Sequence, residues 1–197
     1  MTTQLEPRDA RVDRLPPLAL DQMTEAQRKA ADELIAGPRK GVKGPFIPLL
    51  RSPELLARLQ KVGEYLRFQS ALSTRINEFV MLIVAREWTQ EFEWFIHLPL
   101  AAKAGTSAET LAALAQGQRP STMADDEAIA YDFTTELLAR HGVCDATYAR
   151  TLATFGEQGL MDLTGLIGYF AAISMVLNVA HTPPESMTGP ALARFPR

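Results

Sequence analysis

The stretch RINEFVMLIVAREWTQEFEWFIHLPLAAKAG, residues 75–105, predicts two consecutive helices joined by a short turn. Ser73 or Thr74 is a suitable N-terminal cap for the first helix, which is predicted to run to about Glu87. The second is predicted over about 90–104 and ends at Gly105. Both helices are apolar over most of their surface, so polar side chains between them should be largely shielded from water.

Glu78, Glu93 and His97 form a candidate acid–base site in this stretch. Gln90, Glu93 and His97 are three and four positions apart, so they share one face of the second helix. Glu78 begins the apolar run of the first helix and can reach that face if the two helices pair. A buried carboxyl beside an imidazole can exchange a proton near neutral pH, as general acid–base catalysis requires. The alternative is an exposed Glu93–His97 pair and a Glu78 that only favours the helix start.

The rest of the chain also reads as helical, because no segment shows sustained strand alternation bounded by hairpin turns. Further helices are predicted over about 24–36, 53–69, 107–116, 124–140, 145–158 and 160–180. We therefore predict one all-α domain with an N-terminal extension. Residues 1–44 form an arm, a helix and a Gly/Pro loop, residues 45–182 the helical domain, and residues 183–197 a proline-rich tail.

Composition narrows the possible partners and compartment. The formal net charge is −3 and the basic residues are scattered, which argues against nucleic-acid binding. One cysteine, Cys144, excludes an internal disulfide and a two-cysteine redox motif, and it favours a reducing cytoplasm. Residues 163–180 carry no charge, but they include Asn178 and several small residues. We expect a buried bundle helix or a subunit interface there, not a membrane span.

The segments RINEFVMLIVAREW and EFEWFIHLPLA together resemble the signature of carboxymuconolactone decarboxylase-like proteins. The resemblance spans about residues 45–115, and residues 168–179 resemble the final helix of longer members. It implies the all-helical fold of alkylhydroperoxidase D-like proteins and a homo-oligomer, commonly a trimer or hexamer.

The two better-known branches of this superfamily imply different chemistry. In the alkylhydroperoxidase D branch a Cys-x-x-Cys pair opens the helix that carries the histidine. Here Gln90 and Glu93 occupy the cysteine positions, while Glu78 and His97 match the relay residues. Without a thiolate, attack on a peroxide has no nucleophile.

The decarboxylase branch is closer, because Glu-Trp-x-x-His replaces the cysteine motif. It implies loss of CO₂ from a lactone acid, with His97 or Glu93 as proton donor and Glu78 as a tuning or relay group. Trp94 would pack or form a pocket wall, and Arg67, Arg75 or Arg86 would hold the substrate carboxylate.

The leading hypothesis is thus a lyase that needs no cofactor and no metal, acting on a small carboxylated lactone or aromatic-degradation intermediate. The alternatives are a peroxidase-type antioxidant, disfavoured without motif cysteines, and a non-catalytic oligomer that binds a small acid. The last predicts that Glu78, Glu93 and His97 are separated or solvent-facing. The GPRKGVKGPF loop, residues 37–46, is extra relative to classical decarboxylases, and it is placed to cover the site and change the substrate.

Overall fold

The computed structural model describes residues 12–184, 187 and 189–193. Within these ranges every regular element is helical, so the all-α prediction is confirmed. The elements are η1 (Leu20–Gln22), α1 (Glu25–Ala36), α2 (Phe46–Leu49), α3 (Pro53–Phe68), α4 (Thr74–Glu87), α5 (Glu91–Ala104), α6 (Ala108–Ala115), α7 (Asp125–Arg140) and α8 (Asp145–Ala180).

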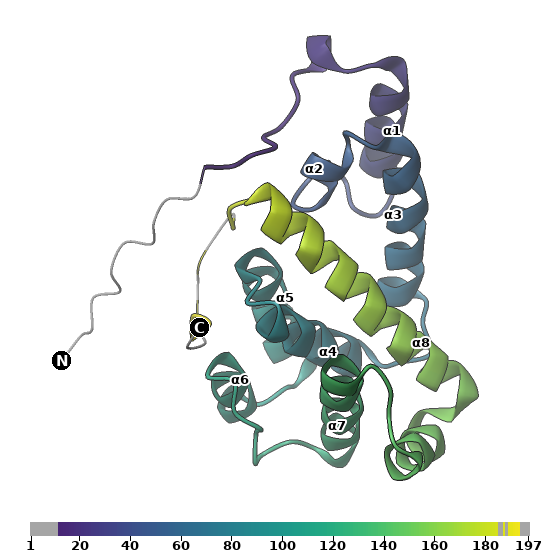
Figure 1. Cartoon of the computed structure of the whole chain (residues 1–197), viewed down its shortest axis with the longest axis vertical. Helices are drawn as coiled ribbons and strands as arrows, with labels where there is room; N and C mark the ends of the chain where they lie inside the picture. The colour runs from purple at the N-terminus through teal and green to yellow at the C-terminus, as the bar shows by residue number, and fades with distance from the viewer. Residues whose placement is uncertain (1–11, 185–186, 188, 194–197) are drawn as a thin grey trace, which may run out of the picture.

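Helix α4 lies at the centre of the fold, against α5, α7 and α8 (Figure 1). Every residue from Ile76 to Arg86 is buried, and the polar Asn77, Glu78 and Arg86 flank the apolar run of residues 79–85. Side chains on opposite faces of α4 therefore enter two cores. Val80 and Val84 belong to the core shared with α8, and Phe79 and Leu82 to the core shared with α5 and α6.

The predicted helix boundaries hold where a capping residue sets them. The Thr24 hydroxyl accepts from the Gln27 N–H, and the Gln27 side chain accepts from the Thr24 N–H, which makes a complete capping box. Ser73 caps α4 in the same position, and Gly105 ends α5 in the left-handed conformation at φ 108°. These local hydrogen bonds explain why the sequence alone places the ends well.

Helix α8 contains the two predicted C-terminal helices, because non-helical backbone at Gly156 divides it into a shorter part before this residue and a longer part after it, slightly earlier than the predicted junction between residues 158 and 160. It runs across the molecule beside α3, α4 and α7, with one break at Gly156, where φ is 69° (Figure 1). By length and composition it is the one helix of the described ranges that is apolar enough to cross a membrane, and 50% of its apolar window is buried inside the protein. That partial burial suits a helix that covers the core with one face.

The predicted Gly/Pro loop crosses from α1 to α3 and contains the short helix α2. Gly44 adopts a positive φ of 54°, and its Cα lies so close to the Phe92 ring that a Cβ would overlap it. This approach packs the loop onto α5. The loop thereby covers part of the α5 surface next to the candidate site.

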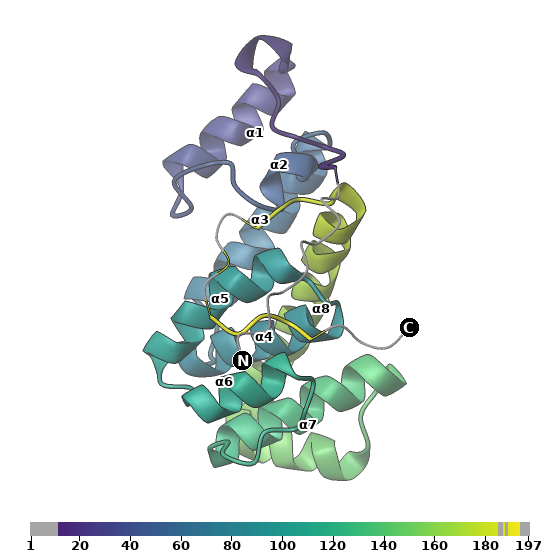
Figure 2. The same cartoon turned by 90° about the vertical axis from the view of Figure 1, so that its left-hand side faces the viewer.

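Residues 189–193 of the C-terminal tail lie across the face formed by α5 and α6 (Figure 2). The indole N–H of Trp94 donates to the Pro190 carbonyl at 2.7 Å, and the Ala193 N–H donates to the Ala115 carbonyl at 3.0 Å. Leu192 is buried against this face. Part of the predicted arm (residues 1–11) and part of the predicted tail (185–186, 188 and 194–197) lie outside the described residues. The division of the chain at residues 44 and 182 stays a prediction.

Candidate acid–base site

His97 lies between two carboxylates in the interior of the protein. Its Nδ1 is 2.6 Å from Glu78 Oε2, and its Nε2 is 3.2 Å from Glu93 Oε2. The exposed fractions are 2% for His97, 6% for Glu78 and 4% for Glu93. The three predicted catalytic residues therefore form one buried triad, and the separated, solvent-facing arrangement is not what the fold adopts.

The turn between α4 and α5 sets this geometry. Gln90 caps α5 by accepting hydrogen bonds from the Phe92 and Glu93 N–H groups. Its amide donates to Asn178 of α8 at 3.0 Å, and Asn178 in turn donates to the Trp88 carbonyl at 3.1 Å. Because these hydrogen bonds connect the start of α5 to α8, the α5 face that carries Glu93 and His97 is held toward α4 and the pocket.

The environment of His97 favours its charged form. Burial alone would lower the pKa of the imidazole, but the hydrogen bonds with Glu78 and Glu93 outweigh it and raise the pKa above its ordinary value. Phe170 packs edge-on against the ring, at 5.3 Å between centroids. Both ring nitrogens lie within hydrogen-bond reach of a carboxyl group, so the protonated ring can donate to Glu78 and to Glu93. Proton sites this close titrate as one coupled set.

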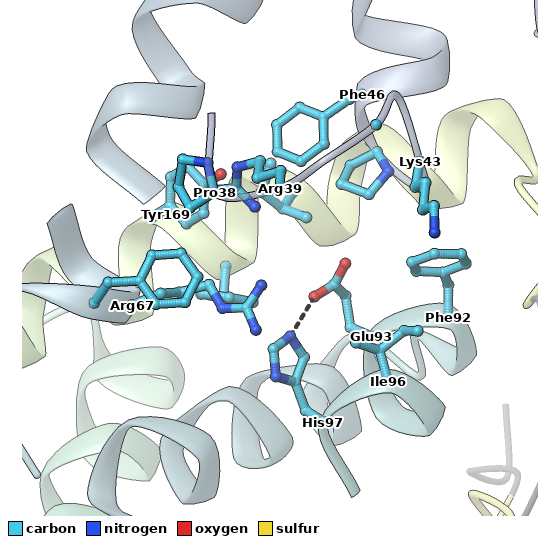
Figure 3. A pocket seen from close by; sticks show the side chains of 15 residues that line it. Pro38, Arg39, Lys43, Phe46, Arg67, Phe92, Glu93, Ile96, His97 and Tyr169 are labelled. Atoms are coloured by element: carbon cyan, nitrogen blue, oxygen red, sulfur yellow. Dashed lines mark ion pairs between the residues drawn. The ribbon is translucent and has the colours of Figure 1, made fainter. Parts of the chain in front are cut away.

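A pocket of about 310 Å³ opens on the Glu93 side of the triad (Figure 3). Its lining combines Glu93 and His97 with side chains from the 37–46 loop, α3, α5 and α8. The lining residues are Pro38, Arg39, Gly41, Lys43, Pro45, Phe46, Arg67, Phe68, Phe92, Glu93, Ile96, His97, Tyr169, Phe170 and Ile173. Glu78 is absent from this lining and instead borders a second hollow with Ser73, Arg75 and Lys103.

The predicted substrate-binding residues separate into one that meets the pocket and three that do not. Arg67 lines it, with Nη2 4.0 Å from Glu78 Oε1. Arg75 lies outside it, bound to Asp126 at 2.7 Å and Glu127 at 2.9 Å. Arg86 is buried near the end of α4, where burial lowers its pKa. Trp94 is fully buried under the tail.

Sequence reasoning missed three polar residues of the pocket, Arg39, Lys43 and Tyr169. Arg39 and Lys43 come from the loop that was expected to cover the site, but no residue in it was singled out. Tyr169 belongs to the quoted Gly-Tyr-Phe segment, without an assigned role. Burial raises the pKa of Tyr169 to about 12, with Arg39 opposing, so its hydroxyl stays protonated and can donate. A tyrosine within the uncharged 163–180 helix was the available signal.

Redox and metal chemistry have little structural support at this site. Cys144 is exposed at the start of α8, with its N–H and thiol directed to Glu136. It does not line the pocket. In the ranges that the structure describes, no group of three or more His, Cys, Asp or Glu side chains has the arrangement of a metal site. The expected independence from metals and cofactors stays a prediction.

The fold is that of the alkylhydroperoxidase AhpD core. An uncharacterised peroxidase-related protein from Ralstonia eutropha JMP134, described as an AhpD core, superposes with a TM-score of 0.72 at 13% identity, over 89% of this chain and 93% of its own. An uncharacterised peroxidase-related protein from Silicibacter sp. TM1040 gives 0.70 at 13% identity, over 92% and 95%. No family model matches the sequence, and no curated protein matches it. At this identity the likeness establishes the fold that the resemblance implied.

Proposed function

We propose that the chain is a cofactor-free lyase that uses Glu93, His97 and Glu78 to protonate a carbanion formed from a small carboxylated substrate. The observation that carries the proposal is the contact of both His97 nitrogens with buried carboxylates beside a pocket. Acid–base catalysis needs a group that holds a proton near neutral pH and can deliver it within hydrogen-bond reach.

The three groups take different roles because they face different spaces. Glu93 borders the pocket and is the group that meets the substrate. His97 supplies its proton to Glu93 across the 3.2 Å contact and regains one from solvent. Glu78 stabilises the imidazolium from the far side at 2.6 Å. Since Glu78 does not line the pocket, we assign it a positioning role.

The reaction that fits these roles is decarboxylation of a lactone acid such as 4-carboxymuconolactone. The bond from the ring carbon to the carboxylate breaks, CO₂ leaves, and the electron pair moves into the conjugated lactone carbonyl. The proton on Glu93 then adds to the resulting enolate-like carbanion. Arg67 lies beside the pocket and stabilises the negative charge on the substrate while this pair moves.

A peroxidase activity is the alternative, because both similar structures are described as peroxidase-related. That chemistry needs a reactive thiolate. The positions that match the cysteines hold the helix cap Gln90 and the triad member Glu93, and the one cysteine of the chain, Cys144, is not in the pocket. These residues favour proton transfer over peroxide reduction.

The test is a paired assay of the wild type, His97→Gln and the control His141→Gln, which makes the same change at an exposed histidine. CO₂ release from 4-carboxymuconolactone should fall about 10²-fold or more in His97→Gln and stay unchanged in the control. Hydroperoxide reduction with a dithiol should be at background in all three.

Either of two results would contradict the proposal. One is CO₂ release by His97→Gln at the wild-type rate, and the other is no release by the wild type. Dithiol-dependent peroxide reduction that survives Cys144→Ser would require a different mechanism altogether.

We also propose that the chain assembles as a homo-oligomer. Apolar side chains remain exposed on two adjacent helices: Leu55, Val62 and Phe68 on α3, and Met161, Met175 and Val179 on α8. Faces of this kind are typical of subunit contacts. Size-exclusion chromatography with light scattering should give a trimer or hexamer, and a strict monomer at micromolar concentration would contradict this.

A further inference from the structure

The 37–46 loop brings a second guanidinium group to the pocket. Arg39 lies next to Arg67, and both flank Tyr169, while Glu93 and His97 face them across the space (Figure 3). Gly63 of α3 permits this arrangement. A Cβ there would overlap the Tyr169 hydroxyl and lie 2.8 Å from Arg39 Nη2. Two like charges are thus held close together on one wall.

Both guanidinium groups rest on aromatic rings. Arg39 Cζ is 4.4 Å from the centre of the Phe46 ring, and Arg67 Cζ is 5.2 Å from that of Phe68. Cation–π contacts at these distances hold each guanidinium against a ring without using its N–H donors in a hydrogen bond. The two cations are therefore oriented before any ligand arrives.

Several of their donors have no partner. Among the described residues, Arg39 Nε and Nη2 and Arg67 Nε are buried and make no hydrogen bond. Buried donors left unpaired are costly, and native structures nearly always satisfy them. An oxyanion in the pocket would supply the missing acceptors, and the fork of a guanidinium matches the two oxygens of a carboxylate.

The charge count suits an anionic ligand. Arg39, Arg67 and protonated His97 carry three positive charges, and Glu78 and Glu93 carry two negative ones. One positive charge is in excess, and Lys43 adds another across the pocket. The remaining walls are mostly apolar, with Phe92, Ile96 and Ile173 among them. Because of these apolar walls, an apolar ring that bears a carboxylate complements the lining better than phosphate does.

We propose that Arg39 and Arg67 form a carboxylate-binding subsite, so that the 37–46 loop supplies part of the recognition of a small carboxylate with an apolar ring. Tyr169 contributes a neutral hydroxyl donor. That the bound carboxylate is a substrate rests on the proposed function. That the pocket binds a carboxylate does not.

The experiment measures binding of benzoate to the full chain by NMR chemical-shift titration, with neutral, isosteric benzamide and inorganic phosphate as comparison probes. The variants are Arg39→Gln, Arg39→Lys and Lys40→Gln, which removes one charge from the exposed neighbour. Thermal unfolding of each variant verifies that it is folded.

The expected result is benzoate binding to the wild type that is at least about tenfold tighter than benzamide or phosphate binding. Arg39→Gln should lose about tenfold of the benzoate affinity, Arg39→Lys should retain part of it, and Lys40→Gln should equal the wild type. If Arg39→Gln does not fold, the loss of benzoate affinity in folded Arg39→Lys tests the proposal instead.

The proposal is overturned if benzoate and benzamide bind equally, if phosphate binds more tightly, if the wild type binds no benzoate, or if removal of Arg39 changes nothing. Failure of the proposed function looks different. Wild-type protein would then bind benzoate and release no CO₂ from 4-carboxymuconolactone.

Discussion

Two clusters of charged side chains in this fold differ in how the guanidinium donors are used. The first is Arg75 with Asp126 and Glu127, and the second is Arg39 with Arg67. Arg75 is held by Asp126 at 2.7 Å and by Glu127 at 2.9 Å, and hydrogen bonding to Asp126 is the main cause that raises its pKa. Arg39 and Arg67 keep buried nitrogens without hydrogen-bond partners, and burial lowers the pKa of Arg39. The first cluster ties α4 to α7, whereas the second faces a pocket.

The difference separates arginines that hold the fold from arginines that await a ligand. In sequence, Arg67 and Arg75 are equivalent candidates, because each is a cation near the acid–base stretch. Only the partners around each guanidinium distinguish them. A donor satisfied by protein carboxylates contributes stability, and a buried donor without a partner is available for binding.

The largest expected effects come from substituting one arginine of each cluster and measuring both stability and benzoate affinity. Arg75→Gln should lower the free energy of unfolding by about 2 kcal/mol, because it leaves the buried carboxylate of Glu127 without its ion pair. Benzoate affinity should be unchanged. Arg67→Gln should do the reverse, with benzoate binding about tenfold weaker and a smaller change in unfolding. Chemical denaturation and NMR titration measure the two quantities.

The comparison breaks if both variants lose stability and binding together, since the two clusters would then form one structural unit. Equal stability losses with intact binding would place Arg67 among the residues that hold the fold.

A second test leaves the charges in place and disturbs only their spacing. Gly63→Ala should weaken benzoate binding severalfold, because the new methyl group displaces Tyr169 and Arg39. Gly168→Ala is the matched control on the neighbouring helix, where a Cβ meets nothing within 4 Å. The control should bind normally and gain about 0.5 kcal/mol of stability. Identical titrations for both variants would show that Gly63 does not organise the subsite.

A smaller effect is expected at Trp94, which the sequence suggested as packing or pocket wall. Trp94→Phe removes the hydrogen bond to the Pro190 carbonyl and should cost about 1 kcal/mol of stability. Benzoate binding should not change, because the indole lies under the tail and not in the pocket. A variant with weakened binding and unchanged stability would move Trp94 back to the pocket wall.

The features that the sequence predicts correctly are local. Helices α1, α4, α5, α6 and α7 begin and end close to their predicted bounds, because caps such as Thr24, Ser73 and Gly105 act within a few residues. The contact of His97 with Glu93 follows from i,i+4 spacing, and the contact with Glu78 follows from a short turn between paired helices.

The features that the sequence does not predict depend on distant packing. Arg39 reaches the pocket because the loop packs through Gly44 onto Phe92, and Tyr169 reaches it because α8 crosses α3 at Gly63. No periodicity encodes such contacts. The break between the two parts of α8 was predicted from the sequence, but it lies at Gly156 and not at the predicted junction between residues 158 and 160.

The acid–base half of the site predicts a small effect of pH on stability. The folded state raises the pKa of His97 above its ordinary value near 6.5, so it binds the proton more tightly than the unfolded chain does. This contribution to stability is fully present below that value and is lost as pH rises through the folded pKa. Between about pH 6 and about pH 9 the unfolding midpoint of the wild type should fall more than that of His97→Gln. Parallel curves would mean that His97 carries no such linkage.

The most direct test of the central claim is an NMR pH titration of the His97 ring proton, with and without benzoate. The chain has 3 histidines, so the signal is assigned by its loss in His97→Gln. A buried triad beside an anion pocket predicts a His97 pKa above that of an exposed histidine, and a shift of the His97 signal when benzoate binds. A pKa below the ordinary value, or a signal indifferent to benzoate, would contradict the account.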